Sequence, residues 1–259
     1  MRLGAYTLHE ELGRGTFGVV HRATGPDGAV VAVKVLLAPD PEALARFDRE
    51  RRILAQLDAA AGFVPLLDAG EGAGRPYLVM PLLEGGTLAA RLLAGPLPVA
   101  EGVALASRLA RALGAAHALG VIHRDLKPAN VLFDRAGRAF VSDLGLARHF
   151  GRAEGNGSQA SLTATGSFAG TIGYVAPEQL DDARRATPAS DVFSLAAVLF
   201  ECLAGRRPYP GDGPLSYARS IDAGAKRLDA LRTGVPPALA SAVARALARD
   251  PGQRPPDGA

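Results

Sequence analysis

Short apolar runs separated by glycine- and proline-containing turns fill the first part of the chain. Residues 6–8 and 19–20 predict two strands, joined by the glycine-rich turn of residues 13–18. The apolar runs at 30–34 and 77–83 predict two further strands. This part of the chain is therefore expected to contain a small sheet.

One segment between these strands has helical periodicity instead. From Pro41 to Leu57, apolar side chains recur at the spacing that places them on a single stripe of a helix. The stripe consists of Leu44, Phe47, Leu54 and Leu57. Residues 1 to about 80 thus combine short strands with one helix.

Beyond Gly85-Gly86 the pattern becomes mainly helical. Short apolar runs at 121–122, 131–133 and 139–141 are of the kind that fix polar loops against a core. Residues 150–168 are rich in Gly, Ser and Thr and contain almost no apolar side chains, which predicts a mobile loop.

The composition is that of an ordinary globular enzyme. The 259 residues are 48% hydrophobic and 21% charged, which allows a sizeable core. The net charge of +3 comes without a basic cluster or aromatic stripe, so nucleic acid is not expected as a partner. The single cysteine, Cys202, lies in an apolar run and is expected to be buried rather than reactive.

The sequence carries no signal of export or membrane insertion. Its first residues lack the apolar stretch of a signal peptide, and no run approaches the roughly 18 apolar residues of a transmembrane helix. We therefore expect a cytoplasmic domain without a membrane segment. If the natural protein extends past Ala259, the domain could be the cytoplasmic part of a membrane-anchored receptor.

The most informative polar motif is HRDLKPAN at residues 123–130, followed by Asp143. Phosphoryl transfer from ATP needs one carboxylate for the acceptor hydroxyl and one cation for the transferred group, which Asp125 and Lys127 can supply. It also needs oxygen ligands for Mg²⁺, which Asn130 and Asp143 can supply. A surface turn could carry the first three residues of the motif alone, but each further residue meets a separate chemical demand.

Gly13, Gly15 and Gly18 form a G-x-G-x-x-G run, whose backbone N–H groups can approach a phosphate closely. Taken alone, the run also fits a dinucleotide-binding turn or an ordinary hairpin. A dinucleotide fold wants a helix directly after the glycines, whereas Val19 and Val20 continue as a strand. The strand context favours a loop that covers the phosphates of ATP.

Lys34 ends an apolar run, so its ammonium projects from an otherwise buried strand. By itself it could be an edge residue whose ammonium reaches water. Glu50, three residues after Phe47 and four before Leu54, lies on the inward face of the predicted helix. We therefore expect Glu50 to pair with Lys34 and to position it on the phosphates.

Together these motifs resemble the catalytic domain of bacterial eukaryotic-like (Hanks-type) Ser/Thr protein kinases, over nearly the whole chain. The resemblance implies an α+β, two-lobed protein-kinase-like fold over residues 1–259. Its N-lobe, about 1–80, would hold a small antiparallel β-sheet and one main helix. A hinge at about 81–85 would lead to a larger, mainly helical C-lobe at about 86–259.

The resemblance also implies a set of residues for each part of the site. The residues implied to bind ATP are Leu12, Gly13, Arg14, Gly15, Thr16, Phe17, Gly18, Val19, Val20, Ala32, Lys34, Met80, Pro81, Leu82 and Leu83. The implied catalytic residues are Asp125, Lys127, Lys34, Glu50 and Thr171, and the implied ligands of Mg²⁺, or of Mn²⁺ in its place, are Asn130 and Asp143. Pro81 has no N–H to donate, so Leu83 is the expected backbone donor to adenine.

Further downstream the resemblance implies structural roles. Ala176-Pro177-Glu178 resembles the segment that closes the activation loop, and Arg254 resembles the arginine that pairs with its glutamate. Asp191 resembles the aspartate that braces the catalytic loop. The chain departs from the family pattern at Leu144, where Phe is usual.

The resemblance implies an ATP-dependent kinase that acts on Ser/Thr hydroxyls of protein substrates. Two alternatives remain open. A pseudokinase scaffold would normally have lost one of Lys34, Asp125, Asn130 and Asp143. A small-molecule phosphotransferase of kinase-like fold would lack Thr171 and the segment that follows it.

The loop at 150–168 lies between Asp143 and Glu178, where kinases place their activation loop. Phosphorylation there could order the loop, because Arg124 could pair with the added phosphate. The expected acceptors are Thr163 and Thr165, with Ser161 and Ser167 behind them. Dimerisation would allow this autophosphorylation to occur in trans.

Overall fold

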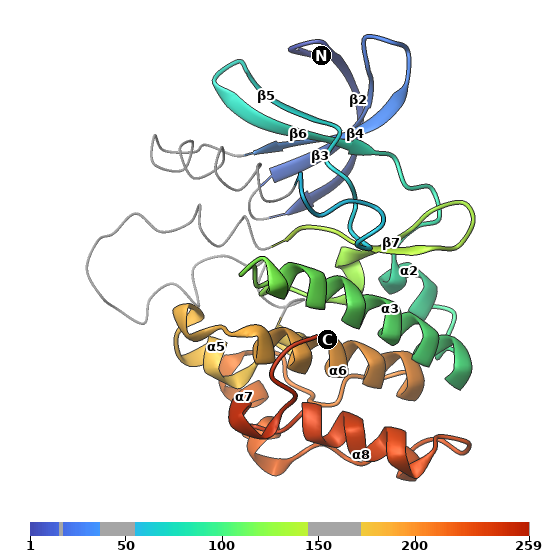
Figure 1. Ribbon diagram of the computed structural model, residues 1–259, viewed down its shortest axis with the longest axis vertical. Coiled ribbons are helices and arrows are strands. Elements are labelled where there is room, and N and C mark those ends of the chain that lie inside the picture. Colours follow the sequence, from blue (N-terminus) through green and yellow to red (C-terminus); the bar gives the residue numbers. More distant parts are fainter. Residues whose placement is uncertain (16–17, 37–54, 145–171, 259) are drawn as a thin grey trace. The chain divides into compact units, whose positions relative to one another are not determined.

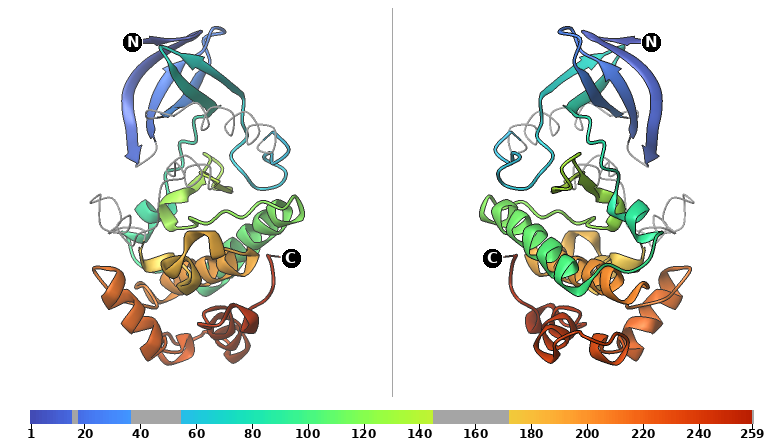
Figure 2. Two further views of the ribbon diagram at one scale, coloured as in Figure 1. Left: turned by 90° about the vertical axis from the view of Figure 1, so that its left-hand side faces the viewer. Right: turned by 90° about the vertical axis from the view of Figure 1, so that its right-hand side faces the viewer.

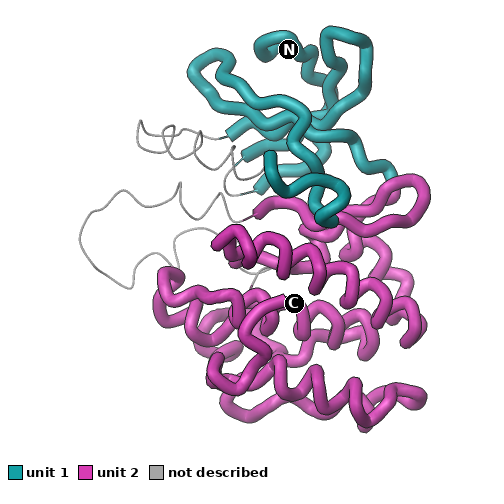
Figure 3. Tube along the Cα trace, viewed as in Figure 1, with its two compact units in different colours: residues 1–84, 145–157 teal, residues 85–144, 158–259 magenta. Residues whose placement is uncertain are grey.

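The computed structural model describes residues 1–15, 18–36, 55–144 and 172–258. The described residues form two compact units, one within residues 1–84 and one within residues 85–258 (Figure 3). Most of the helix predicted over residues 41–57 and the whole loop predicted over residues 150–168 lie outside the described residues.

The first unit contains a six-stranded antiparallel sheet with the strand order β1-β2-β3-β4-β6-β5 (Figure 1). Its strands are β1 (Arg2–Leu3), β2 (Tyr6–Gly15), β3 (Gly18–Thr24), β4 (Val30–Leu36), β5 (Asp68–Gly72) and β6 (Arg75–Pro81). The predicted glycine-rich hairpin is confirmed, with Gly15 opposite Gly18 at its end. The predicted strands at 30–34 and 77–83 correspond to β4 and β6.

One face of this sheet carries the core of the first unit. Directly paired residues share a face, as Val33 and Val79 do. The Tyr6 and Tyr77 rings meet edge to face at 5.8 Å, and the Tyr6 hydroxyl donates to Asp68 at 2.7 Å. Burial, followed by this bond, raises the pKa of Tyr6 to about 12. The core consists of Leu3, Tyr6, Leu8, Ala23, Val31, Val33, Val35, Tyr77 and Val79.

The second unit is mainly helical. Its helices are α2 (Leu88–Leu92), α3 (Val99–Ala118), α5 (Pro177–Asp181), α6 (Pro188–Ala204), α7 (Pro214–Ala223) and α8 (Pro237–Ala246). Short 3₁₀ turns are η1 (Pro128–Asn130), η3 (Ile172–Tyr174), η4 (Ala183–Arg185), η5 (Leu228–Ala230) and η6 (Pro251–Gln253). A small antiparallel ribbon pairs β7 (Val131–Phe133) with β8 (Ala139–Val141).

Helix α6 is the centre of this unit because it is apolar on nearly all sides. It packs against α3 on one side and α8 on another, and Figure 2 shows α7 and α8 on the side of α6 away from α3. A Cβ at Gly102 of α3 would lie 2.6 Å from the Leu203 side chain, so glycine permits the close approach of α3 and α6. The helix ends at Gly205, whose φ of 67° gives the left-handed C-cap.

Cys202 lies in the buried part of α6, as the sequence predicts. Burial, followed by the nearby Glu201 carboxylate, raises the pKa of its thiol to about 12. The thiol therefore stays protonated at neutral pH and acts as a small apolar side chain. None of the helices in the described ranges combines the length and apolar character that a bilayer-spanning segment needs.

Candidate active site

Asp125, Lys127 and Asn130 form one hydrogen-bonded cluster in the second unit. Lys127 Nζ donates to Asp125 Oδ2 at 2.8 Å, and Asn130 Nδ2 donates to the same oxygen at 3.2 Å and to the Asp125 backbone carbonyl at 2.8 Å. Pro128 starts the 3₁₀ turn that bends the chain back and brings these residues together. The second carboxylate oxygen, Oδ1, accepts no hydrogen bond from the described residues and can accept one from a further group.

The β7–β8 ribbon brings Asp143 next to this cluster. Val131 pairs with Val141, and the ladder continues with the Ser142 N–H donating to the Asn130 carbonyl at 2.9 Å. Asp143 follows directly in the chain. Asn130 and Asp143 are thus neighbours because two short apolar strands pair in one register, although they are far apart in the loop sequence.

Two residues beside this cluster have a strained backbone conformation. Among the described non-glycine residues, a positive φ occurs only at Ala73, Arg124 and Asp143. Ala73 is in the tight turn between β5 and β6, where such values are usual. Arg124, at 66°, and Asp143, at 56°, are in or beside the predicted catalytic and metal-binding residues. Strain of this kind costs about 1–3 kcal/mol per residue and tends to collect at functional sites.

Asp191 holds the backbone of the strained loop in place. Its Oδ2 accepts the His123 N–H at 2.7 Å and its Oδ1 accepts the Arg124 N–H at 2.8 Å. The carboxylate is fully buried near the start of α6. The expectation that Asp191 braces the catalytic loop is confirmed.

The His123 ring connects the loop to the residue before Asp143. Its Nδ1 accepts the Asp125 N–H at 3.3 Å, so the proton of the neutral ring lies on Nε2. That proton is donated to the Ser142 carbonyl at 2.9 Å. One buried imidazole therefore connects the backbone of Asp125, the predicted catalytic residue, with the backbone beside Asp143, the predicted metal ligand.

Two further residues hold this framework that the sequence did not indicate. His117 donates from Nε2 to Asp191 at 2.9 Å, and its Nδ1 accepts the Gly258 N–H at 3.2 Å. Gln179 donates to the Arg124 carbonyl at 3.2 Å. Neither residue lies in a motif, and their partners are far away in the chain, so no local pattern could have revealed them.

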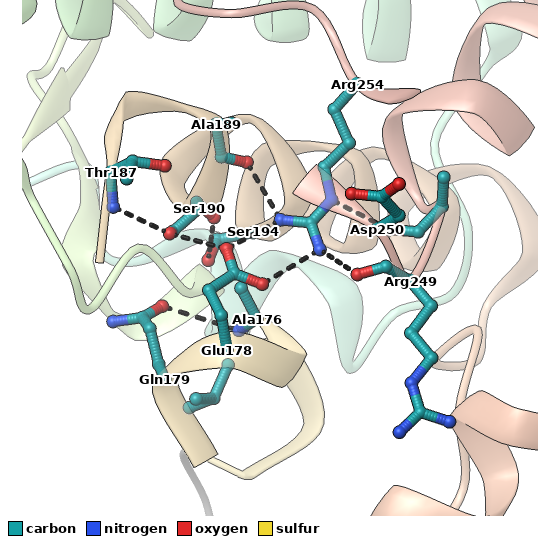
Figure 4. Close-up of polar contacts among 12 residues, drawn as sticks. Ala176, Glu178, Gln179, Thr187, Ala189, Ser190, Ser194, Arg249, Asp250 and Arg254 are labelled. Carbon is teal, nitrogen blue, oxygen red and sulfur yellow. Dashed lines mark hydrogen bonds and ion pairs between the residues drawn. The ribbon is translucent and has the colours of Figure 1, made fainter. Parts of the chain in front are cut away.

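The segment around Glu178 is fixed by a buried ion pair with Arg254 (Figure 4). Arg254 Nη1 and Nη2 donate to the two Glu178 oxygens at 2.7 and 2.9 Å, and the Ser190 hydroxyl donates to Oε1 at 2.6 Å. Arg254 also donates to backbone carbonyls, including that of Ala189. The pairing of Glu178 with Arg254 expected from the sequence is confirmed, and it is structural because both side chains are buried.

The electrostatics of Glu178 follow from two opposing causes. Burial by itself would raise its pKa, but the hydrogen bonds from Arg254 and Ser190 outweigh burial and hold the pKa of Glu178 below its ordinary value. The carboxylate thus remains ionised, and the segment from Ala176 to Gln179 is held by charge-assisted hydrogen bonds.

In the first unit, some of the residues expected to meet ATP share the sheet face opposite the core. Lys34 of β4 lies directly between Val20 of β3 and Leu78 of β6. Ala32 pairs with Met80 two residues further along the same face. Alternation of side chains along a strand thus gathers four of the predicted ATP-contacting residues on one surface, whereas Val19 pairs with Val35 and points to the other face.

The glycine-rich hairpin has two kinds of glycine. A Cβ at Gly18 would lie 2.7 Å from the Val35 carbonyl, so packing of β3 against β4 requires glycine there. A Cβ at Gly13 or Gly15 would meet nothing within 4 Å. Packing gives no reason for these two glycines, and the predicted close approach of a phosphate to the backbone would be a reason. Leu12, beside them, has 47% of its surface exposed.

The other residues predicted to contact ATP lie on the hairpin surface or at the end of β6. Arg14 pairs with Glu11 on the hairpin surface. Pro81 ends β6, and Leu82 and Leu83 follow it, half-buried. Several predicted residues lie outside the described part of the chain, namely Thr16, Phe17, Glu50, Ser161, Thr163, Thr165, Ser167 and Thr171.

Asn130 and Asp143 suit a hard divalent cation by their chemistry. The Asn130 amide nitrogen is occupied by Asp125, which turns the amide oxygen Oδ1 away from that partner. This oxygen and the Asp143 carboxylate are the ligand types that Mg²⁺ prefers, and Mg²⁺ bound by so few protein ligands completes its shell with phosphate and water. The described residues contain no cluster of three or more His, Cys, Asp or Glu side chains that would suggest a different metal site.

A family model described as the protein kinase domain matches residues 6–256 of the chain. Serine/threonine-protein kinase PknL of Mycobacterium tuberculosis is 40% identical over 229 residues, which cover 86% of this chain and 55% of PknL. PknK of the same species is 40% identical over 252 residues, covering 95% of this chain and 22% of PknK. PknE of Mycobacterium bovis is 35% identical over 258 residues, covering 98% and 44%.

Among solved structures, the kinase domain of Mycobacterium tuberculosis PknI, in a mutant form, superposes with a TM-score of 0.72 at 28% sequence identity. The match covers 100% of this chain and 93% of that one. The chain spans about half the length, or less, of the curated relatives it matches. The match therefore concerns one domain of those longer proteins.

Proposed function

The chain belongs to the protein kinase family, in its bacterial Hanks-type Ser/Thr branch, and we propose that it transfers the γ-phosphoryl group of ATP to Ser and Thr hydroxyls of proteins. The observation that carries this proposal is the Asp125 carboxylate, which Lys127 and Asn130 fix through one oxygen while the other stays available.

In this mechanism Asp125 Oδ1 accepts a hydrogen bond from the acceptor hydroxyl and orients its oxygen toward the γ-phosphorus. Proton transfer to a positioned carboxylate contributes about 10²- to 10⁴-fold to a rate. Lys127, already beside Asp125, places its positive charge where charge develops on the transferred group. Asn130 and Asp143 would hold Mg²⁺, or Mn²⁺ in its place, which supplies charge neutralisation on the phosphates.

ATP itself would lie against the sheet face that carries Val20, Ala32, Lys34 and Met80. Apolar side chains there suit the adenine ring, and Lys34 suits the α- and β-phosphates. The open space above Gly13 and Gly15 supports phosphate contact by backbone N–H groups. Glu50 would hold Lys34 in position, and Leu83 N–H would bond to adenine.

A protein substrate is favoured over a small alcohol by the segment that follows the predicted activation loop. Residues 172–181 are fixed to the second unit by Glu178 and by Gln179, which also contacts the Arg124 carbonyl of the catalytic loop. A small-molecule phosphotransferase has no need for this connection. The relatives are named as Ser/Thr protein kinases, which agrees with a peptide substrate and with a role for Thr171 in selecting it.

Regulation would follow from phosphorylation between Asp143 and Glu178, with Thr163 and Thr165 as the first acceptors. Arg124 is next to the catalytic aspartate, where a phosphate on the loop could pair with it. Transfer between two copies of the chain would make activation depend on protein concentration. We also propose a cytoplasmic location for the domain, either by itself or as the cytoplasmic part of a longer, membrane-anchored receptor kinase.

A transfer assay with radiolabelled ATP tests this function against its alternatives. The protein is incubated with Mg-ATP alone, with a basic protein substrate and with small hydroxyl compounds. We expect label on Ser and Thr of the protein substrate and on the chain itself. Label on small alcohols alone would support a phosphotransferase, and ATP binding without any transfer would support a pseudokinase scaffold.

A further inference from the structure

The second unit contains a cavity that is lined by none of the residues proposed above for catalysis or ATP binding. It has a volume of about 220 Å³ and lies among α6, α7, η5 and α8. Its walls are formed by six buried apolar or aromatic side chains. These are Phe200, Tyr209, Ile221, Leu228, Val243 and Leu247.

The charged residues that line this cavity are all cations: Lys226, Arg227 and Arg249. Arg227 pairs with Asp229 and Arg249 pairs with Asp222, but neither of these carboxylates lines the cavity. Lys226 makes no ion pair with any residue in the described ranges. All three cations are solvent-exposed, so they lie at the mouth, while the apolar side chains form the interior.

From this arrangement we propose that the cavity binds a small amphipathic monoanion, an aromatic ring on a short chain that ends in a carboxylate. A dry apolar cavity of about 150 Å³ already holds benzene, so 220 Å³ leaves room for the ring and a short substituent. The ring would fill the interior and the carboxylate would remain at the mouth beside Lys226.

The polar groups inside the cavity give no reason to expect a more polar ligand. The Tyr209 hydroxyl donates to the Leu247 carbonyl at 2.9 Å, so the one hydroxyl of the wall is already satisfied. A sugar or nucleotide would bury several hydroxyls or phosphates without partners, at a substantial cost. The charged residues of the lining lie at the mouth, and because Asp229 and Asp222 balance Arg227 and Arg249, Lys226 supplies the remaining positive charge.

Occupation of the cavity would act on residues that hold residues 172–181, the segment that follows the predicted activation loop. The Tyr209 ring stacks on Phe193 at 5.9 Å and meets Tyr217 edge to face at 6.2 Å. Tyr217 donates its hydroxyl to the Val175 carbonyl at 3.0 Å. Arg254, the partner of Glu178, lies 4.9 Å from the Phe193 ring centre. A ligand against Tyr209 would therefore stiffen an aromatic cluster that contacts Val175 of this segment through Tyr217.

The test uses 3-phenylpropionate as the probe, with 3-phenylpropanamide and 3-phenylpropylammonium as neutral and cationic analogues. Calorimetric titration of the full chain should give a Kd on the order of 1 mM or below for the carboxylate, given typical ligand efficiencies. The amide should bind about two- to fivefold more weakly, because an exposed ion pair contributes little. Equal or tighter binding of the ammonium analogue, or no binding of the carboxylate at 10-fold that concentration, would overturn the proposal.

Two variants locate the binding. Ala244→Leu puts a larger side chain into the cavity from α8, and Ala242→Leu makes the same change on the same helix outside the cavity lining. We expect the first to weaken binding at least tenfold and the second to leave it unchanged, with similar thermal melts for both. Equal binding by the two variants would overturn the proposed site.

Two further measurements test the contribution of the Lys226 charge and the location of the bound probe. Lys226→Gln should weaken the carboxylate about two- to fivefold and leave the neutral amide unchanged, whereas Arg219→Gln, an exposed cation outside the lining, should change neither. Hydrogen exchange of the amides in residues 220–229 and 240–249 should slow on addition of the probe. Protection confined to other segments would show binding elsewhere and reject the site. None of these readouts depends on phosphoryl transfer.

Discussion

Two ion pairs in the second unit have nearly the same length and opposite surroundings. Lys127 and Asp125 are 2.8 Å apart with side chains 21% and 26% exposed, and Arg254 and Glu178 are 2.7 Å apart with side chains 0% and 7% exposed. Distance alone would assign them the same role. Their exposure distinguishes their roles, because a partly exposed ion pair can exchange its contacts with a substrate and a buried pair cannot.

The number of hydrogen bonds supports the same distinction. Both oxygens of Glu178 are taken, by Arg254 twice and by Ser190 once. Asp125 has its two side-chain bonds from the described residues on one oxygen. Both oxygens of the buried pair are thus occupied within the protein, which agrees with a structural role. The exposed pair keeps one oxygen available, as a group that must bind an acceptor hydroxyl requires.

The largest expected effect comes from Asp125→Asn. The amide keeps the shape of the side chain but cannot accept the hydroxyl proton, so turnover should fall about 10³- to 10⁴-fold. Unfolding should change little, because the residue is half-open. Steady-state transfer to a peptide and chemical denaturation measure the two quantities. Asp212→Asn, an exposed carboxylate of the same unit, is the matched control and should retain full turnover. A loss below tenfold at Asp125 would contradict its role.

Next in size is the loss of Arg254. Arg254→Met removes the charge but keeps much of the side-chain length, and leaves Glu178 ionised and buried without its partner. Removal of one partner of a buried ion pair costs about 3–5 kcal/mol of unfolding free energy, to be measured by urea denaturation. Arg184→Met breaks the pair with Asp182, in which the Arg184 side chain is 83% exposed, and should leave the midpoint unchanged. Equal shifts for the two variants would remove the distinction between the pairs.

Much of this comparison could be predicted from the sequence. Motif spacing indicated Asp125, Lys127, Asn130 and Asp143, because local chain chemistry brings them together through one turn and one ribbon. Strand alternation likewise put Lys34 on the face opposite the core.

The remainder depends on contacts between residues far apart in the chain. The bonds from His117 to Asp191 and from Ser190 to Glu178 depend on how α3, α5 and α6 pack, which no local pattern contains. The left-handed backbone at Arg124 is also invisible to propensity, since arginine has no preference for it. Such strain persists only where surrounding contacts enforce it, here through Asp191.

A smaller effect distinguishes a hydrogen bond to a charge from one to a neutral group. Ser190 donates to the Glu178 carboxylate at 2.6 Å, and Ser194, one turn further along α6, donates to the Tyr174 carbonyl at 2.8 Å. Ser190→Ala should lower the unfolding free energy by about 1.5–3 kcal/mol and Ser194→Ala by about 0.5–1.5 kcal/mol. Urea denaturation of both variants gives the ratio. If Ser194→Ala were the more damaging, Glu178 would not be the centre of this network.

The smallest effect is the dependence of the buried pair on pH. The pKa of Glu178 is lower in the folded chain than in the unfolded chain, so the unfolded chain binds more protons as the solution is acidified. The stabilisation is therefore complete above the unfolded value of about 4.3 and is lost as the pH falls through the folded value. The difference in unfolding free energy between the wild type and Glu178→Gln should shrink below about pH 4.3. Added salt should change this difference little, because a buried pair is poorly screened. A difference that stays constant down to about pH 2 would mean that Arg254 and Ser190 do not hold the carboxylate ionised.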